Sequence, residues 1–179
     1  GFTKTLLFGV SMKKTIIFDL DGTLADIDVR RSKSLKINGK LDWDIFAAPS
    51  SILAWDKPNV PVIKMAQLFK ADGFKIVIFS GRNDRGFFAT KKWLADNDVP
   101  FDLLVLRPDK FKDKSWPIAD GNPATADMRF MPDDILKKKM LDTFVDIKDV
   151  FLVVDDRQKV VDMWRSLGLN TFQVAPGDF

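Results

Sequence analysis

The chain has 179 residues, of which 46% are hydrophobic, and this size and composition fit one α/β domain with a sizeable core. Its 28 basic and 25 acidic residues leave a net charge of +3, which permits an anionic partner without requiring one. Because Cys and His are absent, a thiol nucleophile, a Cys/His zinc site, a disulfide framework and a Ser-His triad are all excluded.

The first eleven residues are expected to lie outside the folded domain. Met12, followed by Lys13 and Lys14, has the features of a native start, so residues 1–11 are expected to be a leader or a cloning remnant. No apolar run approaches membrane-spanning length, and the lack of cysteine is consistent with a cytoplasmic protein. Residues 12–179 are expected to form a single domain.

Apolar runs of strand length alternate with helical patterns along the chain. The first run predicts a buried strand over 15–20 that delivers Asp19 and Asp21 to its tip. Two stretches, 24–57 and 107–131, fit the alternation poorly and are predicted to be irregular inserts. The other predicted elements are, in order, helix 60–73, strand 75–80, helix 85–98, strand 102–106, helix 132–144, strand 150–156, helix 158–168 and strand 171–174.

This alternation predicts a Rossmann-like α/β fold. Continuous apolar strands joined through helices form a parallel sheet that is covered on both faces. Ligands of such sheets bind beyond the carboxyl ends of the strands. Both inserts follow strands, so both should rise over this edge as small cap segments.

Polar side chains gather at the predicted strand ends. The first strand ends in Asp19 and Asp21, the second in Ser80-Gly81-Arg82 and the fourth in Asp155-Asp156. Carboxylates this close repel one another unless a proton or a cation intervenes, and Mg²⁺ is the simplest hard divalent ion that takes oxygen ligands.

The same residue types can transfer a phosphoryl group. Asp19 could attack phosphorus to form an aspartyl phosphate. Asp21 could protonate the leaving alkoxide and later deprotonate the attacking water. Ser80 and neighbouring backbone N–H groups could bind phosphoryl oxygens, and a lysine could neutralise charge.

Four segments resemble the motifs of the haloacid dehalogenase (HAD) superfamily in the family's order. "DLDGT" (19–23) is similar to the nucleophile motif, "IVIFSGR" (76–82) to the second motif, "DDILKKKML" (133–141) to the lysine motif and "VFLVVDD" (150–156) to the fourth. The second acid, Asp21, resembles the phosphatase branch. The C-terminal "VVDDRQKVVDMWRSLGLNTFQVAPGDF" looks like the 3′-phosphatase domains of bacteriophage polynucleotide kinase/phosphatases.

This resemblance implies an Mg²⁺-dependent phosphomonoesterase that acts on the 3′-phosphate end of DNA or RNA, in the cytoplasm of a bacterial host if the chain is phage-encoded. The kinase motif GxxxxGK[ST] is missing, and both inserts look longer than those of the family. The implied catalytic residues are Asp19, Asp21 and Lys137. The implied phosphate or substrate contacts are Thr23, Ser80, Gly81, Arg82, Arg30 and Asp133; the implied metal ligands are Asp19, the backbone carbonyl of Asp21, Asp155 and Asp156.

Several alternatives stay open at this point. The enzyme could instead act on nucleotides or small phosphorylated metabolites, or the chain could be a catalytically silent nucleic-acid-binding module. Lys138 or Lys139 could replace Lys137, and Arg30 with Arg31 could belong to a solvated basic face. DNA or RNA preference and oligomeric state are undetermined.

Both inserts mix cations with aromatic residues, which suits single-stranded nucleic acid, although a lid whose rings pack on the body has the same composition. The residues concerned are Arg30, Arg31, Lys33, Lys36, Lys40, Trp43 and Trp55 in the first insert, and Arg107, Lys110, Phe111, Lys112, Lys114 and Trp116 in the second.

Overall fold

The computed structural model of the protein describes residues 13–108 and 128–179. The predicted leader over 1–11 therefore lies outside the described residues. So does most of the second insert, including Lys110, Phe111, Lys112, Lys114 and Trp116.

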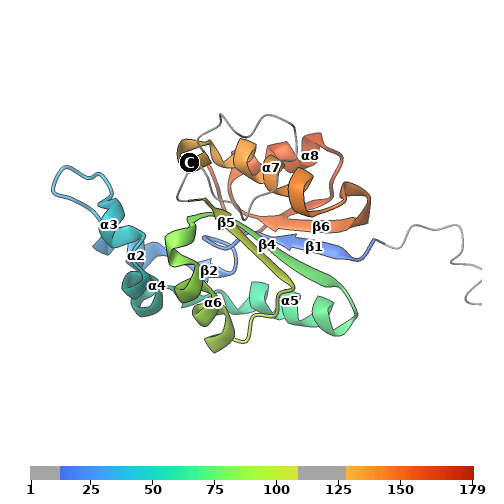
Figure 1. The fold of residues 1–179 in the computed structure, drawn as a ribbon, viewed down its shortest axis with the longest axis horizontal. Coiled ribbons are helices and arrows are strands. Elements are labelled where there is room, and N and C mark those ends of the chain that lie inside the picture. The colour runs from blue at the N-terminus through green and yellow to red at the C-terminus, as the bar shows by residue number, and fades with distance from the viewer. Residues whose placement is uncertain (1–12, 109–127) are drawn as a thin grey trace, which may run out of the picture.

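A parallel sheet of five strands forms the centre of the fold, in the order β5-β4-β1-β6-β7 (Figure 1). This confirms the predicted α/β class. The strands are β1 (Thr15–Phe18), β4 (Lys75–Asn83), β5 (Leu103–Arg107), β6 (Val150–Asp155) and β7 (Thr171–Gln173). β4 extends past the predicted end at 80 because Asn83 pairs with Arg107 beyond an irregularity in the ladder.

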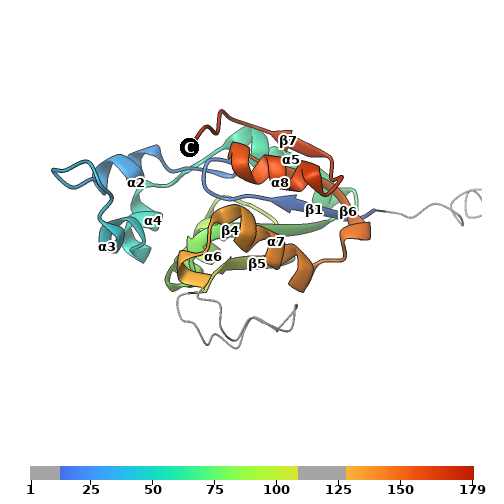
Figure 2. The ribbon, with the colours of Figure 1, turned by 90° about the horizontal axis from the view of Figure 1, so that it is seen from above.

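Helices cover both faces of this sheet, with α5 and α6 on one side and α7 and α8 on the other (Figures 1 and 2). They span α5 (Val60–Ala71), α6 (Phe87–Asp96), α7 (Asp133–Phe144) and α8 (Gln158–Ser166), with short 3₁₀ turns η1 (Asp84–Gly86), η3 (Met128–Phe130) and η4 (Ile147–Asp149). Within the described residues, no helix is both long and apolar enough to cross a bilayer.

Alternating side chains of β1 divide the core into two layers. Ile16 and Phe18 pack with α5 and α6, whereas Ile17 packs with α7 and α8. Because both faces of the strand are buried, β1 is apolar from Ile16 to Phe18, and the first charged side chain, Asp19, follows where the strand ends.

Half of the first insert is helical, so the prediction of an irregular stretch over 24–57 was wrong. It contains α2 (Asp28–Lys33), α3 (Trp43–Phe46) and α4 (Pro49–Trp55), and its two ends pair as an antiparallel ribbon of β2 (Ala25–Asp26) and β3 (Lys57–Pro58). These helices are too short to show a helical repeat in sequence. They are held by tertiary packing of Phe46 and Ile52, which are buried.

We call residues 28–55 the helical arm. It extends from the end of the sheet that lies opposite to the start of β1 (Figures 1 and 2). Since the chain enters and leaves it through the β2–β3 ribbon directly after β1, the arm is fixed beside the carboxyl ends of the strands.

Candidate active site

The carboxyl ends of β1, β4 and β6 meet at one edge of the sheet. A tight turn after β1 allows this approach: Gly22 has a φ of +82°, and a Cβ atom on it would lie 2.1 Å from Asp156 Oδ2. Glycine therefore serves both the backbone conformation and the close contact between the two acidic loops.

Three buried acids form the first cluster at this edge. Carboxylate oxygens of Asp19, Asp155 and Asp156 lie within 4.8 Å of one another. Lys137 joins them from α7, with its Nζ 2.7 Å from Asp19 Oδ1 and 3.0 Å from Asp155 Oδ2. We call these four residues the acid cluster.

The acid cluster has more negative than positive charge. Burial, followed by repulsion from Asp155, raises the pKa of Asp19 well above its ordinary value although Lys137 acts in the opposite direction. Burial also raises the pKa of Asp156. Burial opposes the charge of Lys137 as well, but Asp155 and Asp19 outweigh it and raise the pKa of the ammonium. Buried, mutually repelling oxygen ligands of this kind fit a hard divalent cation.

Neutral donors orient the acid cluster. Thr23 Oγ1 donates to Asp19 Oδ2 over 2.9 Å, and the Trp164 indole donates to Asp155 Oδ2 over 3.1 Å. Each bond holds a carboxylate in one rotamer. Thr23, predicted as a phosphate contact, thus lies against the predicted nucleophile itself.

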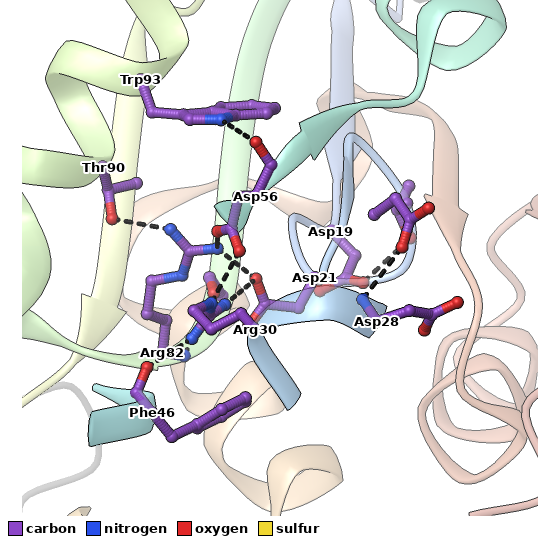
Figure 3. A network of polar contacts seen from close by, with 12 residues as sticks. Asp19, Asp21, Asp28, Arg30, Phe46, Asp56, Arg82, Thr90 and Trp93 are labelled. Carbon is purple, nitrogen blue, oxygen red and sulfur yellow. Dashed lines mark hydrogen bonds and ion pairs between the residues drawn. The ribbon is translucent and has the colours of Figure 1, made fainter. Parts of the chain in front are cut away.

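A second ionic cluster lies beside the first and contains two acids and two arginines, Asp21, Asp56, Arg30 and Arg82 (Figure 3). Arg30 donates from Nε to Asp56 Oδ1 over 2.7 Å and from a terminal nitrogen to Asp21 Oδ1 over 3.2 Å. Arg82 donates to both acids and to Thr90 Oγ1. We call these four residues the arginine cluster.

The two arginines do not affect both acids equally. Burial tends to raise the pKa of Asp21, but Arg82 and Arg30 outweigh it and lower that pKa below its ordinary value. At Asp56, burial prevails over the same arginines and raises the pKa. Asp21 is therefore a carboxylate in the resting protein.

Asp133 lies at a different point of the edge from its helical neighbour Lys137. Its two oxygens accept from Arg107, at 2.5 Å, and from Arg157, at 2.7 Å. A Cβ atom on Gly81 would lie 2.7 Å from Asp133 Oδ1. Asp133 and Lys137 therefore do not form the surface pair that their spacing allows.

The structure distinguishes the lysines and arginines that the sequence left ambiguous. Of the three consecutive lysines, Lys137 reaches the acid cluster, whereas Lys138 pairs with Asp142 in the next turn of α7. Arg30 is 1% exposed, so it does not belong to a solvated basic face, whereas its neighbour Arg31 is exposed.

The other predicted contacts lie at the end of β4. Ser80 is buried, and its Oγ accepts from the backbone N–H of Arg82 over 3.1 Å. The Gly81 carbonyl accepts from Arg107 Nε over 2.8 Å. Phosphate binding by Ser80 and Gly81, and metal binding by the Asp21 carbonyl, remain predictions.

Sequence reasoning missed Asp56. It lies at the end of the first insert, where neither periodicity nor a motif distinguishes it, yet its side chain is buried between Arg30 and Arg82. Its backbone carbonyl also accepts from the Trp93 indole over 3.0 Å. Asp56 thus connects the base of the helical arm to α6 and to the arginine cluster.

The C-terminal segment was also missed as part of the site. Its Gly177 packs so tightly that a Cβ atom would lie 2.0 Å from the Asp156 carbonyl oxygen. Gln173 Nε2 donates to that carbonyl over 3.1 Å, and the Gln158 N–H donates to the Gly177 carbonyl over 2.9 Å. Residues 173–177 therefore hold the loop that presents Asp156 to the acid cluster.

Known proteins resemble this chain in sequence and in fold. Residues 13–179 match the profile of the family described as the polynucleotide kinase PNKP phosphatase domain. Two solved structures of a Pnkp1/Rnl/Hen1 complex, one described as an RNA repair complex, contain chains 30% and 31% identical to this one, with TM-scores of 0.69 and 0.67.

These similar chains are longer than the one described here. Each match covers 95% of this chain but only 48% and 45% of the other, so the chain spans about half of their length. The fold alone is shared with a protein described as a predicted phosphatase from Clostridium acetobutylicum, at 15% identity and a TM-score of 0.64, covering 90% of this chain and 84% of that one.

Proposed function

The chain belongs to the polynucleotide kinase PNKP phosphatase-domain family of the HAD superfamily, and from that premise we propose that it removes 3′-phosphates from the ends of DNA or RNA. The reaction is the hydrolysis of a phosphomonoester through a phosphoaspartate on Asp19, with Mg²⁺ as cofactor.

The observation that carries this proposal is the position of Asp19. It belongs to the acid cluster through Lys137, and it lies two residues before Asp21, which belongs to the arginine cluster. A nucleophile and a proton carrier that occupy differently charged surroundings are what a two-step phosphoryl transfer requires, because one carboxylate must attack while the other exchanges a proton.

In the first step, a carboxylate oxygen of Asp19 attacks phosphorus and the bond to the leaving oxygen breaks. Asp21 donates a proton to that oxygen. The resting carboxylate must be protonated for this, and the negative charge of the arriving phosphate favours protonation by opposing the effect of Arg30 and Arg82. Lys137 stabilises negative charge on the nucleophile and the transferring group.

In the second step, Asp21 removes a proton from water, which attacks the phosphorus of the phosphoaspartate. Inorganic phosphate leaves and Asp19 regains its carboxylate. The lowered pKa of Asp21 keeps it ionised, as a base must be, once it has given its proton to the leaving oxygen in the first step. The proton that it then takes from water passes to the released phosphate or to solvent.

Asp19, Asp155 and Asp156 are the residues that would hold Mg²⁺. A bound divalent ion supplies positive charge that neutralises the three buried carboxylates and the phosphate. One solved structure with this fold, a HAD enzyme from Bacteroides thetaiotaomicron, is described as a complex with magnesium and inorganic phosphate; it is 14% identical, with a TM-score of 0.51.

The family and the shape of the arm support a polynucleotide substrate. One solved structure contains a similar chain within a complex described as an RNA repair complex. The helical arm extends away from the body of the domain (Figure 2), as a wall of an open groove would, and a polynucleotide needs an open path away from the site.

The test is the release of phosphate from a panel of substrates: a 3′-phosphorylated oligonucleotide, the same oligonucleotide with a 5′-phosphate, and 3′-mononucleotides. We expect the 3′-phosphorylated oligonucleotide to have the highest kcat/KM and its advantage over the mononucleotide to shrink as salt rises. Equal efficiency on mononucleotide and oligonucleotide without salt dependence would instead favour a nucleotide or metabolite phosphatase. No turnover of any phosphomonoester would favour the silent binding module.

A further inference from the structure

A large aromatic side chain is exposed on the helical arm. Trp43 is 63% exposed and lies at the start of α3, whose N-cap Asp42 accepts from the backbone N–H groups of Asp44 and Ile45. The indole lies edge-to-face with Phe46 at 5.5 Å between centroids and 84° between planes. Most of its surface is left open to solvent.

Two contacts connect Trp43 to the arginine cluster. Phe46, which is buried, lies beneath the Arg30 guanidinium at 4.3 Å, and its carbonyl accepts from Arg30 over 2.8 Å. Arg30 in turn bonds Asp21. The exposed indole is thus connected to the proposed general acid by an unbroken series of contacts through Phe46 and Arg30.

The segment before Trp43 is rich in cations, although Asp42 and Asp44 flank Trp43 itself. Residues 29–41 contain five cations and no acid: Arg30, Arg31, Lys33, Lys36 and Lys40. Arg30 is buried, and the other four are exposed. Arg31 lies 5.6 Å from the Phe46 ring, and Lys36 and Lys40 flank a turn closed by a bond from the Lys36 N–H to the Lys40 carbonyl.

This combination favours one kind of occupant. An exposed aromatic side chain alone would equally suit a protein partner, but this one follows a segment, 29–41, that contains five cations and no acid. Single-stranded nucleic acid has the complementary chemistry, because cations bind its phosphates and aromatic rings stack on its bases.

We propose that Trp43 is a stacking platform for a base near the 3′ end of the polynucleotide and that Arg31, with the exposed lysines of the arm, binds phosphates of the same strand. This inference rests on the proposed function and names the part of the substrate that the arm holds. It assigns distinct tasks to two adjacent arginines: Arg30 acts inside the arginine cluster and Arg31 on the strand.

The test for stacking compares two 3′-phosphorylated oligonucleotides, one complete and one abasic at its two terminal positions. For the unaltered protein, removal of the bases should lower kcat/KM by about 5- to 100-fold, mainly through KM. Trp43→Ala should lower kcat/KM for the complete oligonucleotide by a similar factor. The comparison is made relative to kcat/KM for a small aryl phosphate, which has no base to stack. The same variant should show no further loss on the abasic substrate, and Trp43→Phe should restore part of the activity.

The test for phosphate binding uses the salt dependence of KM. Arg31→Ala should reduce the slope of log KM against log salt for the oligonucleotide by about 0.7. Lys148→Ala removes an exposed cation before β6 at the opposite end of the sheet, and Leu68→Ala removes an exposed apolar side chain on α5; both should behave as the unaltered protein.

Two outcomes would overturn the inference while leaving the proposed function intact. In the first, the unaltered protein hydrolyses the 3′-phosphorylated oligonucleotide, but removal of the bases lowers kcat/KM of Trp43→Ala by the same factor as it lowers kcat/KM of the unaltered protein. In the second, sedimentation shows that Trp43→Ala separates a dimer into monomers, which would make the arm an interface between copies. Failure of the unaltered protein to act on the 3′-phosphorylated oligonucleotide would instead refute the proposed function itself.

Discussion

The acid cluster and the arginine cluster lie side by side at one edge of the sheet, yet they differ in charge balance. Asp19, Asp155 and Asp156 face the single ammonium of Lys137, whereas Asp21 and Asp56 face the two guanidiniums of Arg30 and Arg82. The first group has an excess of negative charge, and the second is neutral as a whole.

This difference indicates what each cluster is suited to do. Uncompensated buried carboxylates are unfavourable unless a cation joins them, so the acid cluster is suited to bind a metal and to attack. A balanced cluster is complete without a ligand, so it is suited to hold Asp21 in place. The two aspartates of one short turn therefore have pKa values shifted in opposite directions.

Replacement of the nucleophile should have the largest effect of any change in the two clusters. Asp19→Asn should lower kcat by at least about 1,000-fold on every phosphomonoester, because the amide cannot attack phosphorus. Steady-state assays on an alkyl and an activated aryl phosphate would show equal losses, and circular dichroism would confirm the fold. Substantial activity in this variant would remove Asp19 from its role.

Replacement of the proton carrier should instead depend on the substrate. Asp21→Asn should slow an alkyl phosphate by about 100-fold or more, since general acid catalysis contributes about that much. An activated aryl phosphate needs little protonation of its leaving group and should be slowed less. Equal losses on both substrates would show that Asp21 is not the general acid.

Disruption of the arginine cluster should affect the fold as well as the activity. Asp56→Asn leaves two buried guanidiniums with one acid, and removal of one member of a buried ion pair costs about 3–5 kcal/mol. Urea unfolding should show this loss of stability without added Mg²⁺. A change under about 1 kcal/mol would contradict a structural role for Asp56.

The acid cluster should respond to metal, and its response should depend on the C-terminal segment. Mg²⁺ should raise the Tm of the unaltered protein, because binding relieves repulsion among the three acids. Gly177→Ala should weaken the apparent Mg²⁺ affinity by about 10-fold or more, since the added methyl group displaces the loop of Asp156.

Thermal titration with Mg²⁺ measures both effects, and Pro176→Ala, at an exposed neighbouring position, is the matched control. If added Mg²⁺ leaves the Tm of the unaltered protein unchanged and the protein keeps full activity in the presence of a chelator, the metal assignment is refuted.

The ion pair of Asp102 and Lys70, which lies outside both clusters, provides a reference for the loss of stability expected from Asp56→Asn. Asp102 accepts from Lys70 over 2.6 Å and from the Ile76 N–H over 2.8 Å, and these bonds lower its pKa despite burial. Because Lys70 is 43% exposed, Asp102→Asn should cost no more than about 1 kcal/mol.

The pH dependence of that cost has a defined sign. A carboxyl with a lowered pKa in the folded state stabilises the fold above its unfolded pKa, near 3.9, and this stabilisation is lost as pH falls through the folded value. The difference in unfolding free energy between the unaltered protein and Asp102→Asn should thus be constant near neutral pH and shrink below about pH 4. A difference that grew toward acid pH would contradict this assignment.

Much of the fold and part of the site could be predicted from local sequence. Apolar runs ending in acids placed Asp19 after β1 and Asp155 at the end of β6, because a strand buried on both faces becomes polar only where it leaves the core. Parallel topology then brings these ends together. The alternation of strands and helices was sufficient to predict the class of the fold.

The rest depended on contacts between residues far apart in the chain. Three consecutive lysines look alike in sequence, and only the packing of α7 on the sheet directs Lys137 into the acid cluster. Arg30 and Arg31 are equally alike, but the rotation of α2 buries one and exposes the other. No local pattern marks Asp56, and the C-terminal resemblance that includes Gly177 implied no role for it, because each acts through a partner that only the folded chain brings near.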